Sequence, residues 1–532
     1  MARRVMIQEE ASTLRFLQIH SLKVFVMSVR RVMGIESEFG ISNPQDSSAN
    51  PMLLSSQVVN AYGNEVMPNR IRRMRWDYDV ESPLRDARGF DMSRAEADPS
   101  QLTDDDYGLA NLVLPNGARY YVDHAHPEFA SPEVTNPYDA ALWDTAGDRI
   151  IERSARLASK LTGELITVYK NNTDGKGVSY GTHENYQVLR EVPFTDLIKF
   201  LTPFFVTRCI FAGAGRVGLG QENLEPGFQI SQRADFFEAE VGLETTLRRP
   251  IINTRDEPHA DPDIYRRLHV IIGDANMSQK MTYLKMGTTA IVLSMIEAGF
   301  LQLDFELYDA VTSMHLVSHD YKFETKQRLR DGSEMSALEI QRHYQQSAAQ
   351  FLVETNETDE MAHDVVSQWG RILTALEVNP MSLINEVDWI TKLSVLNGYR
   401  NRDQLLWNDS RLAAIDIQFA DLRPDKGLAR VLQQKGKMDL MFTEEQVAMA
   451  VANPPSDTRA YFRGTCVAKF VDQVAAASWD SVILDLGPDV PLKRIATPDA
   501  LGGTKAATAD LFERSNLATE LMANLMPEHV LA

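Results

Sequence analysis

An Asn-Gly pair lies between two runs of alternating residues and limits the local fold to a β-hairpin. Residues 112–124 read LVLPNGARYYVDH, with Asn116 and Gly117 at the centre. Asn-Gly favours the tight turn of a hairpin, so the pattern predicts two antiparallel strands. Alternate residues of a strand point to one face, which is expected to place Arg119, Tyr121 and Asp123 side by side.

Another strand is predicted earlier in the chain, over residues 29–39, which read VRRVMGIESEF and end before Gly40. Glu36 and Glu38 then share a face. Two close carboxylates are costly unless a cation neutralises them, and oxygen ligands favour Mg²⁺ or Mn²⁺. The pair therefore suggests a hard-metal site, with an exposed acidic edge strand as the alternative.

Strands are interleaved with helices early in the chain, and helices dominate later. Residues 164–170 and 177–185 are expected to pair with each other as strands, and residues 281–300 to form a core helix. This order favours an α+β fold with an antiparallel sheet over a doubly wound parallel one. Amphipathic spacing predicts helices near residues 55–62, 139–161 and 194–209.

The chain of 532 residues is predicted to have two domains and a leader. Residues 1–26 are expected to be a disordered leader or a mis-assigned start. Residues 27–455 are assigned to a catalytic domain and residues 456–532 to a small C-terminal domain. Residues 70–106 are polar and charge-dense with weak periodicity, which predicts an inserted surface loop.

Composition excludes several classes of function. The formal net charge of −20 argues against a general nucleic-acid binder. Two cysteines, Cys209 and Cys466, are too few for a disulfide framework and fit a reducing cytoplasm. We expect no membrane span, because residues 281–300 carry Lys285 and Glu297 within their apolar run.

Further polar groups are weaker signals. Residues 179–185 and 253–259 are polar runs beside predicted strands, which favours a site over a satisfied internal network. His124 and His126 have no third nitrogen or sulfur ligand at a spacing that fits zinc. The glycine-rich residues 213–220 follow a predicted helix, fit neither a phosphate-binding loop nor a dinucleotide fingerprint, and are interpreted as a flexible turn.

Five segments of the chain form a distinctive set: residues 34–40 (GIESEFG), 116–128 (NGARYYVDHAHPE), 231–235 (SQRAD), 249–261 (RPIINTRDEPHAD) and 453–464 (NPPSDTRAYFRG). Together these segments resemble the family of Pup ligase and Pup deamidase/depupylase, enzymes that act on the small protein modifier Pup. The long insertion before the Asn-Gly strand and the sequence Asp-His-Ala-His-Pro-Glu resemble the hydrolase branch of the family. The sequence around Glu36 is closer to the ligase branch.

The resemblance implies a glutamine-synthetase-like large domain, whose curved antiparallel sheet forms a cradle with helices, and a small C-terminal domain. Asp123 is implied as the catalytic carboxylate, and ATP or ADP with Mg²⁺ as cofactors. Nucleotide contacts are implied at Arg119, Ser131 and Trp407. The metal ligands that we assign on this basis are Glu36, Glu38, Tyr121, Glu128, His183 and His269.

The implied reaction is hydrolysis that converts the C-terminal Gln of Pup to Glu and releases Pup from target lysines. Asp123 attacks the carbonyl or acts as a general base on water. Pup is acidic in this family, so a basic groove is expected, although each candidate arginine equally fits a structural ion pair. A proteasomal or related AAA ATPase is a further candidate partner. The groove candidates are Arg233, Arg248, Arg249, Arg255, Arg459 and Arg463.

Three alternatives stay open from the sequence. The first is the Pup–protein ligase, which consumes ATP to join the Glu of Pup to lysine. The second is a noncatalytic Pup-binding module, which predicts a replaced carboxylate at Asp123. The third is a small-molecule glutamate–amine ligase.

Overall fold

The computed structural model describes residues 29–68, 74–78, 81–93 and 110–525. The leader predicted over residues 1–26 lies outside the described residues, as does part of the insertion predicted over residues 70–106.

A six-stranded sheet forms the centre of the molecule, and every neighbouring pair of its strands is antiparallel. This arrangement confirms the predicted α+β class and the predicted hairpin around Asn116 and Gly117. In spatial order the strands are β15 (Tyr265–Val270), β10 (Thr182–Leu189), β1 (Met33–Glu38), β8 (His126–Ala130), β7 (Arg119–Asp123) and β6 (Asn111–Val113).

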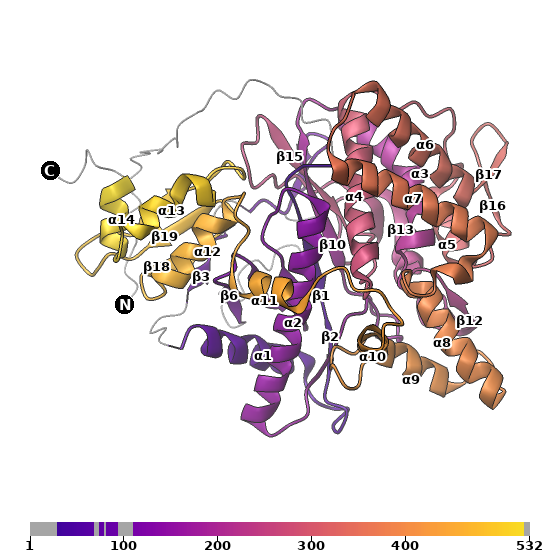
Figure 1. The fold of residues 1–532 in the computed structure, drawn as a ribbon, viewed down its shortest axis with the longest axis horizontal. Coiled ribbons are helices and arrows are strands. Elements are labelled where there is room, and N and C mark those ends of the chain that lie inside the picture. The colour runs from indigo at the N-terminus through magenta and orange to yellow at the C-terminus, as the bar shows by residue number, and fades with distance from the viewer. Residues whose placement is uncertain (1–28, 69–73, 79–80, 94–109, 526–532) are drawn as a thin grey trace.

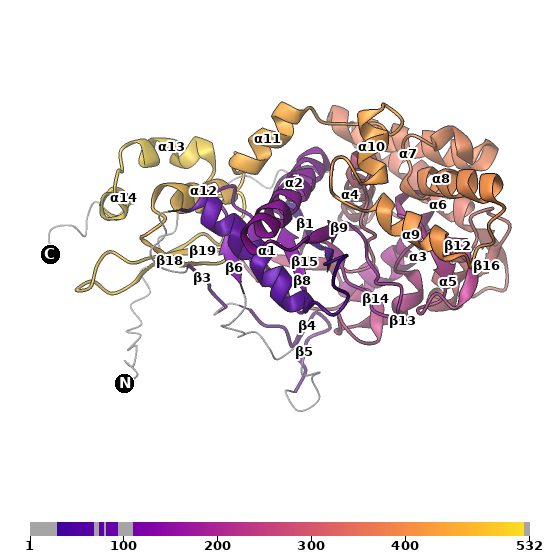
Figure 2. The same ribbon diagram turned by 90° about the horizontal axis from the view of Figure 1, so that it is seen from below.

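Three helices pack against the strands of this sheet (Figures 1 and 2): α1 (Pro51–Val66), α2 (Pro137–Thr162) and α4 (Gln279–Glu297). Local signals set the limits of α2, because Asn136 caps its first turn and Gly163 ends it with a left-handed backbone at φ 79°. One face of the sheet is therefore core: Tyr120 and Tyr186 are fully buried.

The remaining helices before residue 455 lie at the right of Figure 1, except α11, which packs on α2. Ser336 and Glu339 form a capping box at the start of α6. These helices are α3 (Phe194–Ala212), α5 (Ala310–His319), α6 (Ala337–Glu354), α7 (Glu360–Val378), α8 (Asp388–Asp403), α9 (Ser410–Phe419), α10 (Leu428–Gln434) and α11 (Glu444–Ala452).

Five two-stranded sheets surround this core within the described residues. Four are antiparallel, and the pair β13–β14 is parallel. Their strands are β2 (Gly40–Ser42) with β9 (Thr167–Tyr169), β4 (Arg85–Asp86) with β5 (Phe90–Asp91), β11 (Arg216–Leu219) with β12 (Glu225–Gln229), β13 (Phe237–Gly242) with β14 (Arg249–Asn253), and β16 (Lys326–Arg328) with β17 (Glu334–Ser336).

Two sequence predictions about strands are wrong. Residues 164–170 and 177–185 do not pair with each other: β9 pairs with β2, and β10 lies between β1 and β15. The glycine-rich residues 213–220 are not merely a turn, because β11 pairs with β12. The Arg216 side chain fixes this strand by donating to Asp235 at 2.8 Å and to Asn223 at 2.7 Å.

The C-terminal elements form a four-stranded sheet with helices at the left of Figure 1. Its fourth strand, β3 (Arg75–Trp76), comes from the predicted insertion and runs parallel to β18. The other elements are α12 (Ala460–Lys469), β18 (Val474–Ala477), β19 (Ser481–Leu484), β20 (Lys493–Ala496), α13 (Lys505–Glu513) and α14 (Ala518–Leu525).

Two glycines bring α12 against the turn of the central hairpin. Gly117 has φ 82°, and a Cβ atom there would lie 2.9 Å from the carbonyl oxygen of Ala460. A Cβ atom at Gly464 would lie 2.5 Å from the carbonyl oxygen of Pro115. Both approaches are closer than a side chain permits, so the contact depends on glycine at each position.

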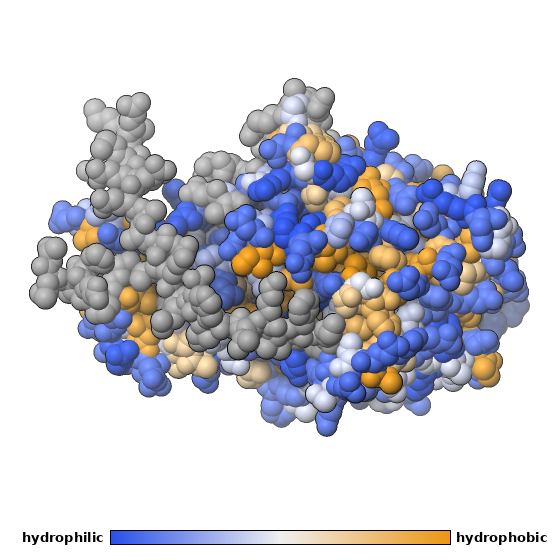
Figure 3. Space-filling model, turned by 90° about the horizontal axis from the view of Figure 1, so that it is seen from above, coloured by the Kyte–Doolittle hydropathy of each residue, from blue (hydrophilic) through white to orange (hydrophobic). Residues whose placement is uncertain are grey.

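The surface seen from above is largely hydrophilic, with apolar residues in separate patches (Figure 3). Within the described ranges, no helix combines the length and the apolar composition that a membrane span needs.

Candidate active site

The face of the central sheet opposite α1 and α2 carries the polar residues that the sequence singled out. The register of the strands shows that these residues share a face, because side chains of residues paired across antiparallel strands lie on the same side of the sheet. Glu38 pairs with Glu128, and Tyr121 pairs with the same Glu128. Glu36 pairs with His183, and Asn185 pairs with His269.

A cluster of three carboxylates lies at one end of this face. Ligand oxygens of Glu38, Asp123 and Glu128 lie within 4.8 Å of one another. Burial, together with the charges of Asp123, Glu38 and Glu36, raises the pKa of Glu128 well above its usual range. Burial and the charge of Glu128 likewise raise the pKa of Tyr121, which keeps that phenol neutral. A divalent cation bound by oxygen ligands would relieve this repulsion.

A second cluster joins Glu36, His183 and His269, whose ligand atoms also lie within 4.8 Å of one another. Burial and the charge of Arg267 lower the pKa of His269 well below its usual value, so its imidazole is neutral and able to bind a metal. His269 Nδ1 lies 3.0 Å from Asn185 Oδ1. The two clusters thus offer two candidate cation sites on one face.

Asp123 occupies the end of β7, just before the turn into β8. Its side chain is 41% exposed, and its Oδ2 lies 3.1 Å from Nδ1 of His124. His124 has a left-handed backbone at φ 50°, which makes this turn tight. The hydrogen bond and the charge of Asp123 raise the pKa of His124 to about 9. The Asp123 carboxylate therefore lies accessible at the rim of the carboxylate cluster.

A cavity of about 420 Å³ is lined by residues of both clusters, although not by Glu38. That size matches the pockets that bind small ligands and cofactors. Arg119, Arg255 and Arg267 line it, which makes it suitable for an anionic ligand. The insertion contributes Tyr78, Glu81 and Pro83 to its wall. Metal candidates that line the cavity are Glu36, Tyr121, Glu128, His183 and His269.

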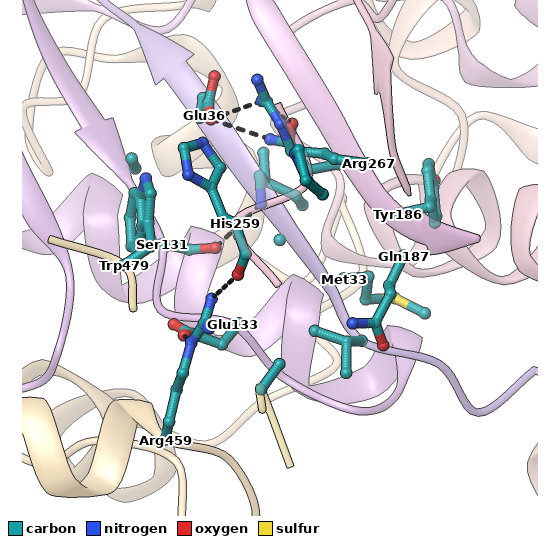
Figure 4. Close-up of a pocket in the computed structure, with 17 residues that line it drawn as sticks. Met33, Glu36, Ser131, Glu133, Tyr186, Gln187, His259, Arg267, Arg459 and Trp479 are labelled. Carbon is teal, nitrogen blue, oxygen red and sulfur yellow. Dashed lines mark hydrogen bonds and ion pairs between the residues drawn. The ribbon is translucent and has the colours of Figure 1, made fainter. Parts of the chain in front are cut away.

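An adjoining pocket is more apolar and shares Glu36, His259, Arg267 and Trp479 with the cavity (Figure 4). Ser131 lines this pocket, and its Oγ accepts a hydrogen bond from the amide of Ile35 at 3.0 Å. In Figure 4 the His259 and Trp479 side chains face the space in front of Glu36. Burial and the charge of Arg267 lower the pKa of His259 to about 4, so this imidazole is neutral at pH 7.

Trp407 does not lie at either pocket, which corrects its assignment as a nucleotide contact. Its ring packs 5.9 Å from that of Phe228, and the guanidinium of Arg400 lies 4.0 Å above it. The tryptophan that does line both pockets is Trp479, which no pattern in the sequence had singled out.

Three of the six candidate groove arginines, Arg233, Arg459 and Arg463, are structural. Arg459 and Arg463 are 4% and 2% exposed, and both bind the carboxylate of Glu133. Their other donors bind backbone carbonyls, including that of Gly117, so neither is available to a peptide. Arg233 is buried and donates to the Ile271 carbonyl.

Arg255 alone of the six lines the cavity, with Glu257 at 3.8 Å. Of the remaining two candidates, Arg248 is exposed, and Arg249 donates to the Ser179 carbonyl at 2.8 Å. Neither lines the cavity.

Sequence comparison identifies relatives over nearly the whole chain. A model of the Pup-ligase protein family matches residues 31–483. The depupylase of Acidothermus cellulolyticus is 55% identical, covering 93% of this chain and 99% of its own. The Pup deamidase/depupylase of Mycolicibacterium smegmatis is 51% identical, over 93% and 100%. The Pup–protein ligase of Corynebacterium jeikeium is 37% identical, over 92% and 96%.

Solved structures of similar fold agree with these matches. The ligase PafA in its crystallised complex with Pup has a TM-score of 0.76 and 31% identity, with 91% of each chain covered. The Pup ligase PafA in complex with ADP has a TM-score of 0.70 and 36% identity, covering 76% of this chain and 89% of that one. Given the family match and these relatives, the chain belongs to the Pup-ligase protein family.

Proposed function

We propose that this chain is a hydrolase that deamidates the C-terminal Gln of Pup and cleaves the isopeptide bond between Pup and target lysines. The observation that carries the proposal is the accessible carboxylate of Asp123 at the rim of the cavity. Relatives named depupylase and Pup deamidase/depupylase are 55% and 51% identical, against 37% for a ligase. These identities favour hydrolysis over ligation.

In the reaction that we favour, Asp123 attacks the side-chain carbonyl carbon of the terminal Pup residue. The carbon–nitrogen bond breaks, and the nitrogen takes up a proton from water and leaves as ammonia or as the lysine amine. Water then opens the mixed anhydride, which restores the Asp123 carboxylate and leaves Pup ending in Glu. The His124 imidazole, whose Nδ1 lies 3.1 Å from Asp123 Oδ2, would orient this carboxylate for attack.

The same face suits Mg²⁺ and a nucleotide. Glu36, Tyr121 and Glu128 would hold a cation, with Glu38, His183 and His269 as further ligands; the repulsion around Glu128 supports this fit. When bound, Mg²⁺ supplies positive charge that stabilises an oxyanion. Arg119 would bind nucleotide phosphates, and the apolar pocket of Ser131 and Trp479 suits the base.

Pup and pupylated proteins are the proposed partners, with Arg255 as the remaining substrate-binding candidate. A proteasomal or related AAA ATPase, which the resemblance suggests, is a further proposed partner. A cytoplasmic location, which the presence of only two cysteines fits, and a domain boundary near residue 455 complete the proposal.

Incubation with Mg-ATP and Pup ending in Gln tests the activity. We expect Pup to gain about one dalton, as NH2 is replaced by OH, without matching loss of ATP. Conversion of ATP in step with attachment of Pup ending in Glu to proteins would instead identify the chain as a ligase.

Substitution of Glu128→Gln tests the cation site. The amide has nearly the same size but lacks charge, so we expect the Mg²⁺ concentration for half-maximal activity to rise at least about tenfold. Glu225→Gln, at an exposed position on β12, is the matched control and should leave that concentration unchanged. An unaltered Mg²⁺ requirement in Glu128→Gln would remove this residue from the ligand set.

A further inference from the structure

Arg119 is held between two aromatic rings that come from different parts of the chain. Its guanidinium carbon lies 4.1 Å from the ring centre of Trp76 and 3.9 Å from that of Tyr121. Tyr121 neighbours Arg119 on β7, whereas Trp76 belongs to the insertion strand β3. Both distances are well within the range of cation–π attraction.

Hydrogen bonds also hold the edge of the Arg119 guanidinium in place. Arg119 Nε donates to Asn111 Oδ1 at 3.2 Å, and Nη2 donates to the Tyr78 hydroxyl at 3.3 Å. Asn111 in turn donates to the same hydroxyl at 3.1 Å. Among the described residues, Nη1 has no hydrogen-bond partner, and no carboxylate forms an ion pair with Arg119. The guanidinium therefore keeps donors for an anion in the cavity that it lines.

Trp76 is itself anchored on three sides. Its indole Nε1 donates to Glu81 Oε1 at 2.6 Å, and its ring packs edge-on against Trp479 at 5.2 Å. The backbone of β3 pairs with β18, and the next residue, Asp77, binds Arg494 at 2.6 Å. Trp76 is only 5% exposed. The ring that covers Arg119 is thus part of the C-terminal sheet.

We propose that Trp76 is a positioning residue that holds Arg119 ready to bind the phosphates of the nucleotide. This inference rests on the proposed function, because it takes Arg119 as a phosphate ligand. A free arginine side chain loses rotamer entropy when it is fixed, and that loss weakens binding. In this chain the two rings and the Asn111–Tyr78 pair fix it before the nucleotide binds. Docking of β3 on the C-terminal sheet thereby contributes to nucleotide affinity.

The test compares ATP and ADP affinity, by calorimetry on the full chain, in four variants. Trp76→Phe keeps an aromatic face, and we expect at most about a threefold loss. Trp76→Leu fills the space without a ring and should weaken binding about 5- to 30-fold, the equivalent of a desolvated cation–π contact. The other two variants are Arg119→Ala and the double variant Trp76→Leu with Arg119→Ala.

The energetic coupling between Trp76 and Arg119 in nucleotide binding shows whether Trp76 acts through Arg119. If Trp76 acts through Arg119, the leucine substitution should cost little further affinity once Arg119 is alanine. Equal losses in both backgrounds, or normal binding by Trp76→Leu, would overturn the inference. Normal binding by Arg119→Ala would instead refute the phosphate role in the proposed function. Melting temperatures of the Leu and Phe variants, measured in parallel, show whether a loss of affinity follows a loss of folding.

Discussion

Asp123→Asn is expected to lower the rate of Pup deamidation at least about 10³-fold, the range seen when an essential nucleophile or base is removed. The amide is a poor nucleophile at carbon and cannot act as a base at neutral pH. It has the same shape, and it removes one charge from the repelling carboxylate cluster, so the fold is expected to persist. The measurement is the mass of Pup over time under saturating Mg-ATP.

The matched control is Asp263→Asn, an exposed carboxylate outside the cavity, which should retain the full rate. Turnover in oxygen-18-labelled water separates the two roles of Asp123. Direct attack should place label in the Asp123 carboxylate after many turnovers, because water can open the anhydride at either carbonyl. Label in Pup alone would favour a general base.

Glu133→Gln is expected to lower the free energy of unfolding by about 3–5 kcal/mol, the cost of breaking a buried ion pair by removing one partner. Glu133 Oε1 accepts from Arg459 Nε at 2.7 Å and from Arg463 Nη1 at 3.1 Å. Without that carboxylate, two buried guanidinium groups face each other unneutralised. Urea denaturation, read at the midpoint and the slope, measures the loss.

Glu306→Gln is the control for removal of a charge. Glu306 pairs with Arg330 at 3.2 Å, but both side chains are at least 50% exposed, so we expect a change below about 1 kcal/mol. Similar losses of unfolding free energy in the two variants would mean that the buried ion pairs of Glu133 stabilise the fold no more than an exposed pair does.

The Glu133 pair also predicts a pH dependence. Burial alone raises the pKa of Glu133, but the charges of Arg463 and Arg459 outweigh it and lower the pKa from 4.5 to about 2. A carboxyl group with a depressed pKa stabilises the fold above its unfolded pKa. The contribution is therefore complete above about pH 4.5 and declines as the pH falls toward 2. The difference between wild type and Glu133→Gln should shrink over that window.

Local signals predicted the elements of this fold better than their pairing. The helix expected over residues 139–161 is α2, because Asn136, Pro137 and Gly163 define its ends. Pairing of β9 and β10 was missed because their partners lie far away in sequence. The strand β11 was missed because Arg216 fixes it through Asp235, a tertiary contact that outweighs glycine content.

In the candidate site, too, local patterns were predicted correctly, whereas contacts between distant segments were not. Strand alternation alone placed Arg119, Tyr121 and Asp123 on one face, as the register of β7 and β8 confirms. The sequence did not predict that Arg459 and Arg463 both form ion pairs with Glu133, because these pairs form only when α12 packs near Glu133. No spacing rule distinguished Trp479 from Trp407, because only the fold brings one of them to the cavity.

The close approach of Gly117 to Ala460 and of Gly464 to Pro115 bears on how this protein can be recombined with its relatives. Neither residue can become smaller, so a larger residue at one position cannot be compensated by a change at the other. A chimera that takes the hairpin from one parent and α12 from another succeeds only if both parents keep this close approach. The β6–β7 hairpin and α12 are therefore best exchanged as a single block.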